Sequence, residues 1–468
     1  MDEKKQKNRN KYLIKNTLVF SLDNLGTKLI SFVLVPFYTH MLSTADYGTI
    51  DLISTVAMLV IPILTLNISE AIMRFSLDEH ADRQKIMSTG LLLMVAAGFV
   101  SLLVFPIAEK IERLSQYALW IYLYIVSNFS SQILLSNLRG QELLLDYSIG
   151  NILYTFSAAV LNIVFLAGYH LGVRGYFMAN TLAGILTACY AFFKGRVWSI
   201  LRRFSIDGAL MIRMLQFSVV LIPTSFMWWI MNSSDRIMVT WMIGSSANGV
   251  YAVAYKVPTI ASTLSTVFNR AWSYSAIREK NSTDSDAYNN EIYNGLVAAV
   301  LIVAAGLLMI LKPFTRIYVA PEYYSSWQYT PVLIIGAAAL SLGSFAATPY
   351  TVHKDSVGFL KTGAAGALAN VVLNYFLIPG MGVMGAALAT CISYVVVFVF
   401  RVLDTGKYIK LNVFQKKHLL GFGLLAAQAC TEFIDTPTGQ LLLVVEFLCM
   451  LTLFTKEWLV ILKGMFRK

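Results

Sequence analysis

Charged side chains occur inside stretches of this sequence that are otherwise apolar. The segment NSSDR places Asp235 and Arg236 within one apolar run, and Lys28 and Lys256 lie in two others. An ionised side chain is costly when it faces hydrocarbon, so such residues normally face the interior of a helix bundle or an aqueous cavity. Cations and a carboxylate held in such a cavity can bind anionic groups and shift one another's charge state.

Polar residues accompany these charges at helical spacing. In the first apolar stretch the polar residues are four, three, four and three positions apart, which puts them on one face of an α-helix: Thr17, Ser21, Asn24, Lys28 and Ser31. A second stripe, flanked by Lys256 and Arg270, consists of Tyr255, Thr259, Ser262, Thr266 and Asn269. Both stripes predict a polar helix face that is turned toward a cavity.

Two further candidates lie near the ends of apolar stretches. Glu70 and Arg74 share a helix face at i,i+4, and Arg139 follows another apolar run. Each candidate also has a structural interpretation. Polar stripes can pack helices through hydrogen bonds, and Asp235 can neutralise a neighbouring cation.

Arg74, Arg139 and Arg270 can snorkel from helix ends. A packing role does not require a cation, which favours a functional role for Lys28, Arg236 and Lys256. The predicted substrate-binding cations and their partner are Lys28, Arg74, Arg139, Asp235, Arg236, Lys256 and Arg270, and the predicted polar cavity residues are Ser21, Asn24, Glu70 and Tyr255.

The elements that position these residues are predicted to be transmembrane helices. The chain of 468 residues is 57% hydrophobic and only 13% charged, whereas soluble chains are about one quarter charged. Apolar runs of about 20 residues, the length that crosses a bilayer as a helix, recur along the whole sequence. They are too long and too continuously apolar for the strands of a membrane barrel. We therefore expect an all-α polytopic membrane protein.

Loop polarity and proline and glycine positions predict about 14 transmembrane helices, at 14–41, 48–73, 86–108, 115–138, 147–170, 174–194, 214–242, 249–275, 289–312, 328–350, 359–378, 382–404, 417–433 and 440–460. Of the 37 Lys and Arg residues, 29 then fall in segments on the side of the termini, five in opposite loops and three within spans. Positive residues concentrate on the cytoplasmic side, so both termini are predicted to be cytoplasmic.

An internal repeat divides the chain. VLNIVFLAGYHLGVRG from Val160 recurs as VLNYFLIPGMGVMG from Val372, and STADYG at Ser43 has an echo in SSANG at Ser245. Two six-helix lobes follow, related by a pseudo-twofold axis along the membrane normal because each has an even number of helices. The predicted parts are an N-lobe (1–195), an amphipathic cytoplasmic linker (196–213), a C-lobe (214–410) and a C-terminal helix pair (411–468).

Other classes of protein fit the sequence less well. The net charge is +11, but the positive residues lie in loops and form no stripe, so no nucleic acid partner is expected. The four cysteines are scattered without a CxxC motif, and we expect neither a metal site nor a cofactor. No loop is long enough for a separate catalytic domain, so no catalytic residues and no enzyme activity are predicted.

Several short motifs resemble those of the bacterial polysaccharide-transporter (Wzx-type) oligosaccharide flippases. They are LSTADYG from Leu42, SEAIMRF from Ser69, SNLRGQELLLDYS from Ser136, NSSDRIMV from Asn232 and the two GVxG turns. These flippases belong to the multidrug/oligosaccharidyl-lipid/polysaccharide exporter superfamily. The similarity runs across nearly the whole chain and includes the count of fourteen helices.

The resemblance implies a flippase that moves undecaprenyl-diphosphate-linked repeat units across the bacterial cytoplasmic membrane by alternating access, for capsule, O-antigen or exopolysaccharide assembly. It implies cations that meet the diphosphate or acidic sugars, and Arg74, Arg139, Asp235, Arg236 and Lys256 are the matching positions. Membrane lipids and the polysaccharide polymerase machinery are the further implied partners. The resemblance leaves coupling to H⁺ or Na⁺ open, and Asp235 is the candidate residue for it.

Alternatives within the same superfamily are a multidrug and toxin extrusion antiporter and a lipid-linked peptidoglycan precursor flippase. The antiporters typically have twelve helices and prefer cationic drugs, so the extra helix pair and the cationic residues count against them. A membrane enzyme such as a sugar polymerase is expected to have a large outer loop, whereas the longest here is about 15 residues. A purely structural assembly protein would not need cations inside the membrane.

Overall fold

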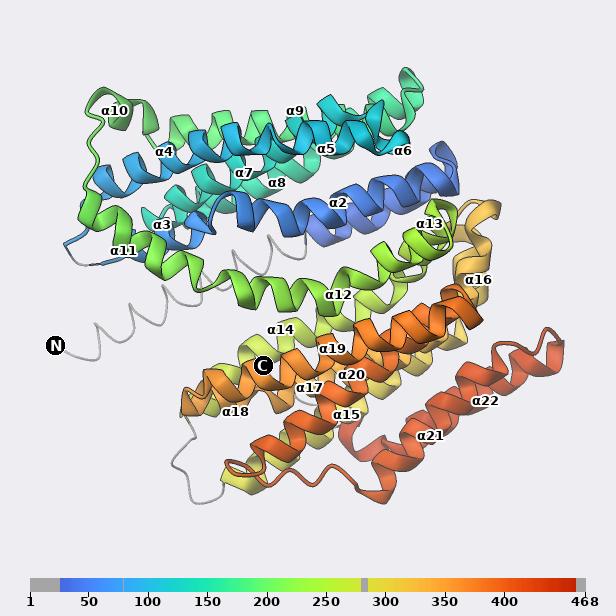
Figure 1. Ribbon diagram of the computed structural model, residues 1–468. Coiled ribbons are helices and arrows are strands. Elements are labelled where there is room, and N and C mark those ends of the chain that lie inside the picture. The colour runs from blue at the N-terminus through green and yellow to red at the C-terminus, as the bar shows by residue number, and fades with distance from the viewer. Residues whose placement is uncertain (1–25, 79, 279–284, 460–468) are drawn as a thin grey trace. The chain divides into compact units, whose positions relative to one another are not determined.

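The computed structural model describes residues 26–78, 80–278 and 285–459, and these residues form helices and no strand (Figure 1). Ten of the described helical segments are long and apolar enough to cross a membrane. The prediction of an all-α polytopic membrane protein is thus confirmed, while the count of fourteen spans stays a prediction. The described residues divide into two compact units that meet in sequence between Phe226 and Met227. The predicted N-lobe, linker, C-lobe and C-terminal pair also stay predictions.

The first unit consists of a helix over residues 26–41 and the helices α2 (Thr44–Leu64), α3 (Ile68–Ser76), α4 (Arg83–Ser101), α5 (Val104–Lys110), α6 (Glu112–Ser115), α7 (Ala118–Gly140), α8 (Leu144–Asn162), the π-helix η1 (Ile163–Gly168), α9 (Gly172–Lys194), α10 (Val197–Arg202), α11 (Gly208–Val219) and the start of α12 (Ile222–Met242). The helices α7, α8 and α9 lie side by side (Figure 1). We call this unit the N-terminal unit.

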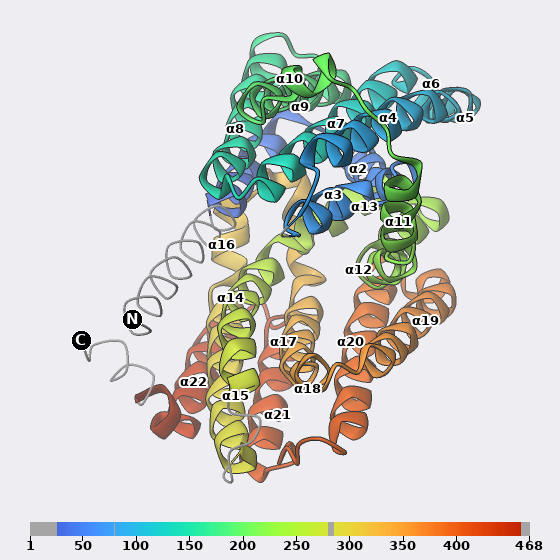
Figure 2. The ribbon, with the colours of Figure 1, turned by 90° about the vertical axis from the view of Figure 1, so that its left-hand side faces the viewer.

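The second unit, called the C-terminal unit, holds the rest of α12 and the helices α13 (Ser245–Ala254), α14 (Lys256–Arg278), α15 (Ser285–Met309), α16 (Leu311–Tyr318), the 3₁₀-helix η2 (Pro321–Gln328), α17 (Thr330–Ala346), α18 (Thr348–His353), α19 (Ser356–Met381), α20 (Val383–Thr405), α21 (Lys416–Thr431) and α22 (Pro437–Leu453). Helix α20 packs against both α17 and α19, and α14, α15 and α17 lie side by side (Figure 2).

Several predicted spans are interrupted in the structure. The predicted helix 48–73 is divided into α2 and α3 because Leu66 and Asn67 adopt positive φ angles of 50° and 55°, which cannot continue a right-handed helix. The predicted helix 249–275 is divided at Tyr255, three residues before Pro258, because proline has no N–H to donate and is tolerated only in the first turn of a helix.

The predicted linker 196–213 contains α10 and the first part of α11. Helix α11 begins at Gly208 because Asp207 caps it, accepting hydrogen bonds from the N–H groups of Ala209 (3.0 Å) and Leu210 (3.2 Å). The predicted helix 214–242 therefore starts earlier than expected and breaks near Leu221. Of the predicted helix 14–41, residues 14–25 lie outside the described residues.

The two GVxG turns have the same local geometry. The first glycine of each turn, Gly172 or Gly382, has a positive φ of 54° or 60°, which favours glycine. The second glycine lies against the preceding segment, where a Cβ atom would clash: Gly175 lies against Leu171 and Phe165, and Gly385 against the backbone of Leu377. The sequence repeat therefore reflects two similar helix–turn–helix corners, at the starts of α9 and α20.

Candidate functional site

The carboxylate of Asp235, on α12, is buried in the C-terminal unit and its side chain is only 2% exposed. Its Oδ2 accepts hydrogen bonds from the hydroxyls of Tyr251 (2.7 Å), Thr390 (3.0 Å) and Tyr255 (3.2 Å). Its Oδ1 accepts the backbone N–H of Arg236 (2.9 Å). Four hydrogen-bond donors thus converge on one carboxylate and offset the cost of removing it from water.

Two asparagines of α19 extend this arrangement. The Asn370 side chain donates to the Thr390 hydroxyl (3.3 Å), and its Oδ1 accepts from Ser234 (3.0 Å) and from the Asn374 amide (2.9 Å). The Asn374 side chain is fully buried, and its Oδ1 makes no hydrogen bond to a described residue. We call Asp235, Tyr251, Tyr255, Asn370, Asn374 and Thr390 the Asp235 network. One carboxylate among hydroxyl and amide oxygens has the chemistry to exchange a proton or hold a hard monovalent cation.

The structure brings three of the predicted site residues together. The guanidinium of Arg236 lies 5.3 Å from the centre of the Tyr255 ring, and Tyr255 bonds Asp235. Lys256 follows Tyr255 as the first residue of α14 and is partly buried. Arg236 thus adjoins the buried carboxylate on α12, and Lys256 adjoins Tyr255, which bonds that carboxylate.

Three residues of the predicted polar stripe, Ser262, Thr266 and Asn269, line a cleft of about 260 Å³ between α14 and α17. Hydroxyl and amide side chains of both helices face it, and these are Ser262, Ser265, Thr266, Asn269, Ser273, Ser341 and Ser344. The Asn269 side-chain oxygen is buried and makes no hydrogen bond to a described residue. The cleft therefore offers unused hydrogen-bonding capacity to a polar ligand.

Another face of the same helix borders an apolar groove of about 520 Å³. Its walls are mainly aliphatic and aromatic and come from α14 and α15: Ala261, Leu264, Phe268, Ile292, Leu296, Ala299, Val300 and Val303. Polar groups also line it, and they are Ser265, Glu291, Asn294, Lys456 and Glu457. Helix α14 thus separates a hydroxyl-lined cleft from an apolar groove.

The predicted residues of the N-terminal unit are placed separately. Lys28 is exposed on the helix 26–41. Glu70 and Arg74 are both on α3, but Arg74 forms its ion pair with Asp78 (2.5 Å). The guanidinium of Arg139, at the end of α7, lies 5.2 Å from the centre of the Tyr147 ring.

The structure describes no side chain for three of the predicted residues. Ser21 and Asn24 lie outside the described residues, and for Arg270 only the backbone, on α14, is described. Within the described part of the chain no group of three or more His, Cys, Asp or Glu residues could hold a metal ion.

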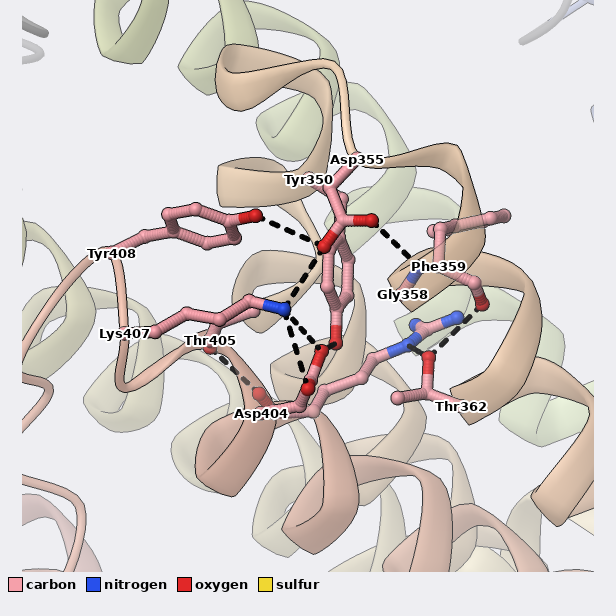
Figure 3. Close-up of polar contacts among 10 residues, drawn as sticks. Tyr350, Asp355, Gly358, Phe359, Thr362, Asp404, Thr405, Lys407 and Tyr408 are labelled. Carbon is pink, nitrogen blue, oxygen red and sulfur yellow. Dashed lines mark hydrogen bonds and ion pairs between the residues drawn. The ribbon is translucent and has the colours of Figure 1, made fainter.

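A second polar cluster, which the sequence did not predict, joins α18, α19 and the end of α20 (Figure 3). Lys407 Nζ contacts Asp355 (3.0 Å) and Asp404 (3.4 Å). The hydroxyl of Tyr350 donates to Asp404 (2.6 Å) and that of Tyr408 to Asp355 (3.0 Å). We call these five residues the Lys407 cluster, and it ties the α18–α19 corner to the segment that follows α20.

Asp355 also caps α19, since its Oδ1 accepts the N–H of Gly358 (2.8 Å). The Gly358 N–H, followed by Lys407 and Tyr408, lowers the pKa of Asp355 from 3.8 to about 2. The side chain of Arg401, one turn before Asp404, is buried and donates to the Gly343 carbonyl (3.0 Å). These bonds fix the corner as a rigid element of the C-terminal unit.

The Asp235 network contains four residues that sequence reasoning missed: Tyr251, Asn370, Asn374 and Thr390. A signal existed for two of them, because Asn370 and Asn374 are four residues apart and share one face of an otherwise apolar helix. Thr390 carried no such signal, since single threonines are common in membrane helices and their hydroxyls often bond their own backbone.

The fold and this polar centre inside apolar helices define a polytopic membrane protein of a known architecture. The structure is similar to that of the lipid II flippase MurJ in an inward closed conformation, with a TM-score of 0.68 and 12% identity, covering 96% of this chain and 100% of that chain. It is also similar to a multidrug resistance MATE family transporter of the MOP superfamily in an inward-facing conformation, with a TM-score of 0.58 and 15% identity over 88% and 96% of the two chains. At these identities the likeness shows the fold.

A family model gives the more specific assignment. The model described as "Polysaccharide biosynthesis protein" matches residues 13–274, more than half of the chain, and the chain belongs to this family. An uncharacterized membrane protein of Methanocaldococcus jannaschii is 25% identical over 154 residues. That match spans 31% of this chain and only 30% of the length of that protein.

Proposed function

We propose that this protein is a flippase that moves undecaprenyl-diphosphate-linked oligosaccharide repeat units across the cytoplasmic membrane by alternating access. The observation that carries the proposal is the position of α14 between a hydroxyl-lined cleft and an apolar groove. A lipid-linked sugar needs both surfaces, because its glycan must stay hydrogen-bonded while its polyprenyl chain stays in an apolar environment. Membership of the polysaccharide biosynthesis family supports this cargo.

The remaining part of the cargo is the diphosphate, and the predicted cations are the residues proposed to bind it. Lys256 begins α14, and the Arg236 guanidinium lies 5.3 Å from the ring centre of Tyr255, the residue before it. Lys28, Arg74, Arg139 and Arg270 are the other candidates. Arginine and lysine neutralise phosphate oxygens through charge-assisted hydrogen bonds. We assign them to the diphosphate and to acidic sugars, with Ser21, Asn24 and Glu70 as polar neighbours of the path.

The Asp235 network is proposed as the place where an ion couples to transport. Its carboxylate is buried, and the network also contains the side-chain oxygen of Asn374, which makes no hydrogen bond to a described residue. Either H⁺ or Na⁺ satisfies this set, because a proton neutralises the carboxylate and Na⁺ prefers oxygen ligands. The proposed role is transport and not catalysis. The product would serve capsule, O-antigen or exopolysaccharide assembly, with the polymerase machinery as a partner and both termini in the cytoplasm.

Two other cargoes fit the same fold. The MurJ likeness raises a lipid-linked peptidoglycan precursor, and the MATE likeness raises a drug. The first differs from our proposal in the glycan only. The second does not require an apolar groove beside the polar cleft.

Deletion of the gene in its native host tests the proposal. We expect a diphosphate-linked repeat unit to accumulate in the inner leaflet and a surface polymer to disappear, and the intact gene to reverse both effects. Arg236→Ala and Lys256→Ala should abolish transport while leaving expression intact. Normal polymer output from both variants would refute the role of the cations, and unchanged glycans with new drug sensitivity would favour the antiporter.

The groove is tested in the same strain. Leu264 lines the groove and is 53% exposed, and Leu264→Trp should lower polymer output about tenfold because the indole fills the space that a polyprenyl chain would occupy. Leu368→Trp is the matched control, since Leu368 is 67% exposed on α19 and does not line the groove. Equal output from the two variants would remove the groove from the mechanism.

A further inference from the structure

The N-terminal unit contains a group of tyrosine and asparagine side chains that the sequence reasoning did not identify. Its members come from the helix 26–41 and from α7, α8 and α9, and they are Tyr38, Tyr124, Asn128, Tyr154, Tyr176 and Asn180. The rings of Tyr38 and Tyr176 meet edge to face at 5.8 Å. The phenols of Tyr38, Tyr124 and Tyr154 lie close enough to Tyr176 to interact with it electrostatically. We call this group the tyrosine–asparagine cluster.

The hydrogen bonds of the cluster are incomplete. The side-chain oxygens of Asn128 and Asn180 both lie 3.4 Å from the hydroxyl of Tyr154. This hydroxyl has one proton, so it can donate to only one of the two oxygens.

Each asparagine amide already donates to its own helix, at the carbonyl of Tyr124 (2.9 Å) or Tyr176 (2.8 Å). One amide oxygen is therefore left for an outside donor. Asn180 is only 7% exposed, and a buried amide oxygen without a hydrogen-bond donor destabilises the protein.

The cluster contains further hydrogen-bonding groups. The hydroxyls of Tyr38 and Tyr176 make no hydrogen bond to any residue that the structure describes, and both side chains remain partly exposed. None of the six side chains carries a charge at neutral pH. Neutral hydroxyl and amide groups on aromatic walls match a ligand that has many hydroxyls, C–H faces that pack on rings, and no charge.

We propose that the tyrosine–asparagine cluster is a binding site for a sugar residue of the transported repeat unit and that it sets the preference for the glycan. This inference rests on the proposed flippase function. A sugar hydroxyl donates to the open amide oxygen of Asn128 or Asn180, and the Tyr154 hydroxyl bonds the other. A site built around a particular hydroxyl rejects ligands that lack it, because its buried polar groups are then left unpaired.

Two probes separate glycan binding from carrier binding. One is the diphosphate-linked repeat unit purified from the deletion strain, and the other is undecaprenyl diphosphate without a glycan. Their dissociation constants are measured by titration of the full-length protein in lipid nanodiscs. The intact protein should bind the repeat unit more tightly than the bare carrier.

Tyr154→Phe removes the shared hydroxyl and keeps the ring, so it should weaken repeat-unit binding roughly fivefold and leave carrier binding unchanged. Asn180→Leu should have the same selective effect, and it provides a second measurement if Tyr154→Phe fails to fold. Tyr122→Phe is the matched control, because the Tyr122 hydroxyl, on α7, bonds Gly98 (3.5 Å) outside the cluster. It should alter neither constant.

The inference is overturned if both variants keep the preference for the repeat unit, or if they weaken both lipids equally, as a structural defect would. A deletion strain that accumulates no repeat unit is a different failure. That result refutes the proposed function itself, and with it the inference.

Discussion

The Asp235 network and the tyrosine–asparagine cluster occupy corresponding places in the two units, yet their chemistry differs. Asn180 and Thr390 each lie eight residues after the first glycine of a GVxG turn, Gly172 or Gly382. Around Thr390 the side chains converge on a carboxylate that is 2% exposed, whereas around Asn180 they are neutral, and the tyrosines remain partly exposed. The repeated GVxG turn thus places polar side chains at equivalent positions in the two units, and the residue types around each position decide whether the cluster contains a charge.

This difference suggests that the two units have different roles in transport. A buried carboxylate responds to protons and cations, because its charge dominates its surroundings. Neutral tyrosine and asparagine groups respond to the shape and hydroxyls of a ligand. We therefore expect the C-terminal unit to govern energy coupling and the N-terminal unit to govern selection of the glycan.

Removal of the carboxylate should have the largest effect. Asp235→Asn keeps the size of the side chain but replaces the acceptor of two tyrosine hydroxyls and the Thr390 hydroxyl by an amide without charge. Transport in the complemented deletion strain should fall at least tenfold, while the amount of folded protein in the membrane changes little. Thr390→Val, which removes one donor, should reduce transport less, by roughly fivefold. Full transport by Asp235→Asn would exclude this carboxylate as the coupling group.

Placing a charge in the neutral cluster should have an intermediate effect. Asn180→Asp puts a carboxylate beside Tyr154, where it gains the Tyr154 hydroxyl but no cation among the cluster residues. Polymer output should fall severalfold, and the loss should be smaller below the pKa of an ordinary aspartate, where the new group is protonated. Tyr122→Phe again serves as the control, and an Asn180→Asp variant with unchanged output would contradict the need for neutrality at this site.

The smallest effect is expected at the Lys407 cluster, outside both centres. The pKa of Asp355 is lowered to about 2 in the folded protein from an ordinary value of 3.8. The ionised carboxylate therefore stabilises the fold fully at pH values above its ordinary pKa of 3.8, and this contribution to stability is lost as the pH falls through about 2. Asp355→Asn should lower the melting temperature of the detergent-solubilised protein by a few degrees at neutral pH, and the difference from the intact protein should vanish in strong acid.

A difference that persists there would assign the effect of Asp355 to packing and not to charge. Transport at neutral pH should be nearly normal in this variant, because the hydrogen-bond partners of Asp355 are Gly358, Lys407 and Tyr408, which belong to neither polar centre. A strong transport defect without a change in melting temperature would instead make the α18–α19 corner part of the transport cycle.

Part of the candidate site could be read from the sequence. Asp235, Arg236 and Tyr255 were predicted because a charge or polar stripe in an apolar helix is costly unless it faces something polar. The stripe of α14 was predicted from helical spacing, and three of its five residues, Ser262, Thr266 and Asn269, line a cleft. The helix face that Glu70 and Arg74 were predicted to share was less informative, since Arg74 forms its ion pair with Asp78.

The tyrosine–asparagine cluster could not be read in this way. Tyrosine and asparagine carry no charge, so their presence in a membrane helix is not costly enough to stand out, and tyrosine is also common at membrane interfaces. Its members are also dispersed over four helices that are more than a hundred residues apart at the extremes, from Tyr38 to Asn180. The Lys407 cluster escaped prediction for a similar reason, because charged residues in loops are expected in any membrane protein.

The sequence by itself determined that this protein is embedded in a membrane, that it is helical and that it repeats the GVxG turn. These features depend on the length of apolar runs, the scarcity of charge and the backbone freedom of glycine, and each of these acts within a short segment of the chain. Only the tertiary structure decided which polar side chains meet. Asp235 obtains its donors from Tyr251, Tyr255 and Thr390, up to 155 residues away in the chain. Such partners are brought together by the packing of α12, α13, α19 and α20, and helical periodicity describes each helix alone, not the neighbours that it will contact.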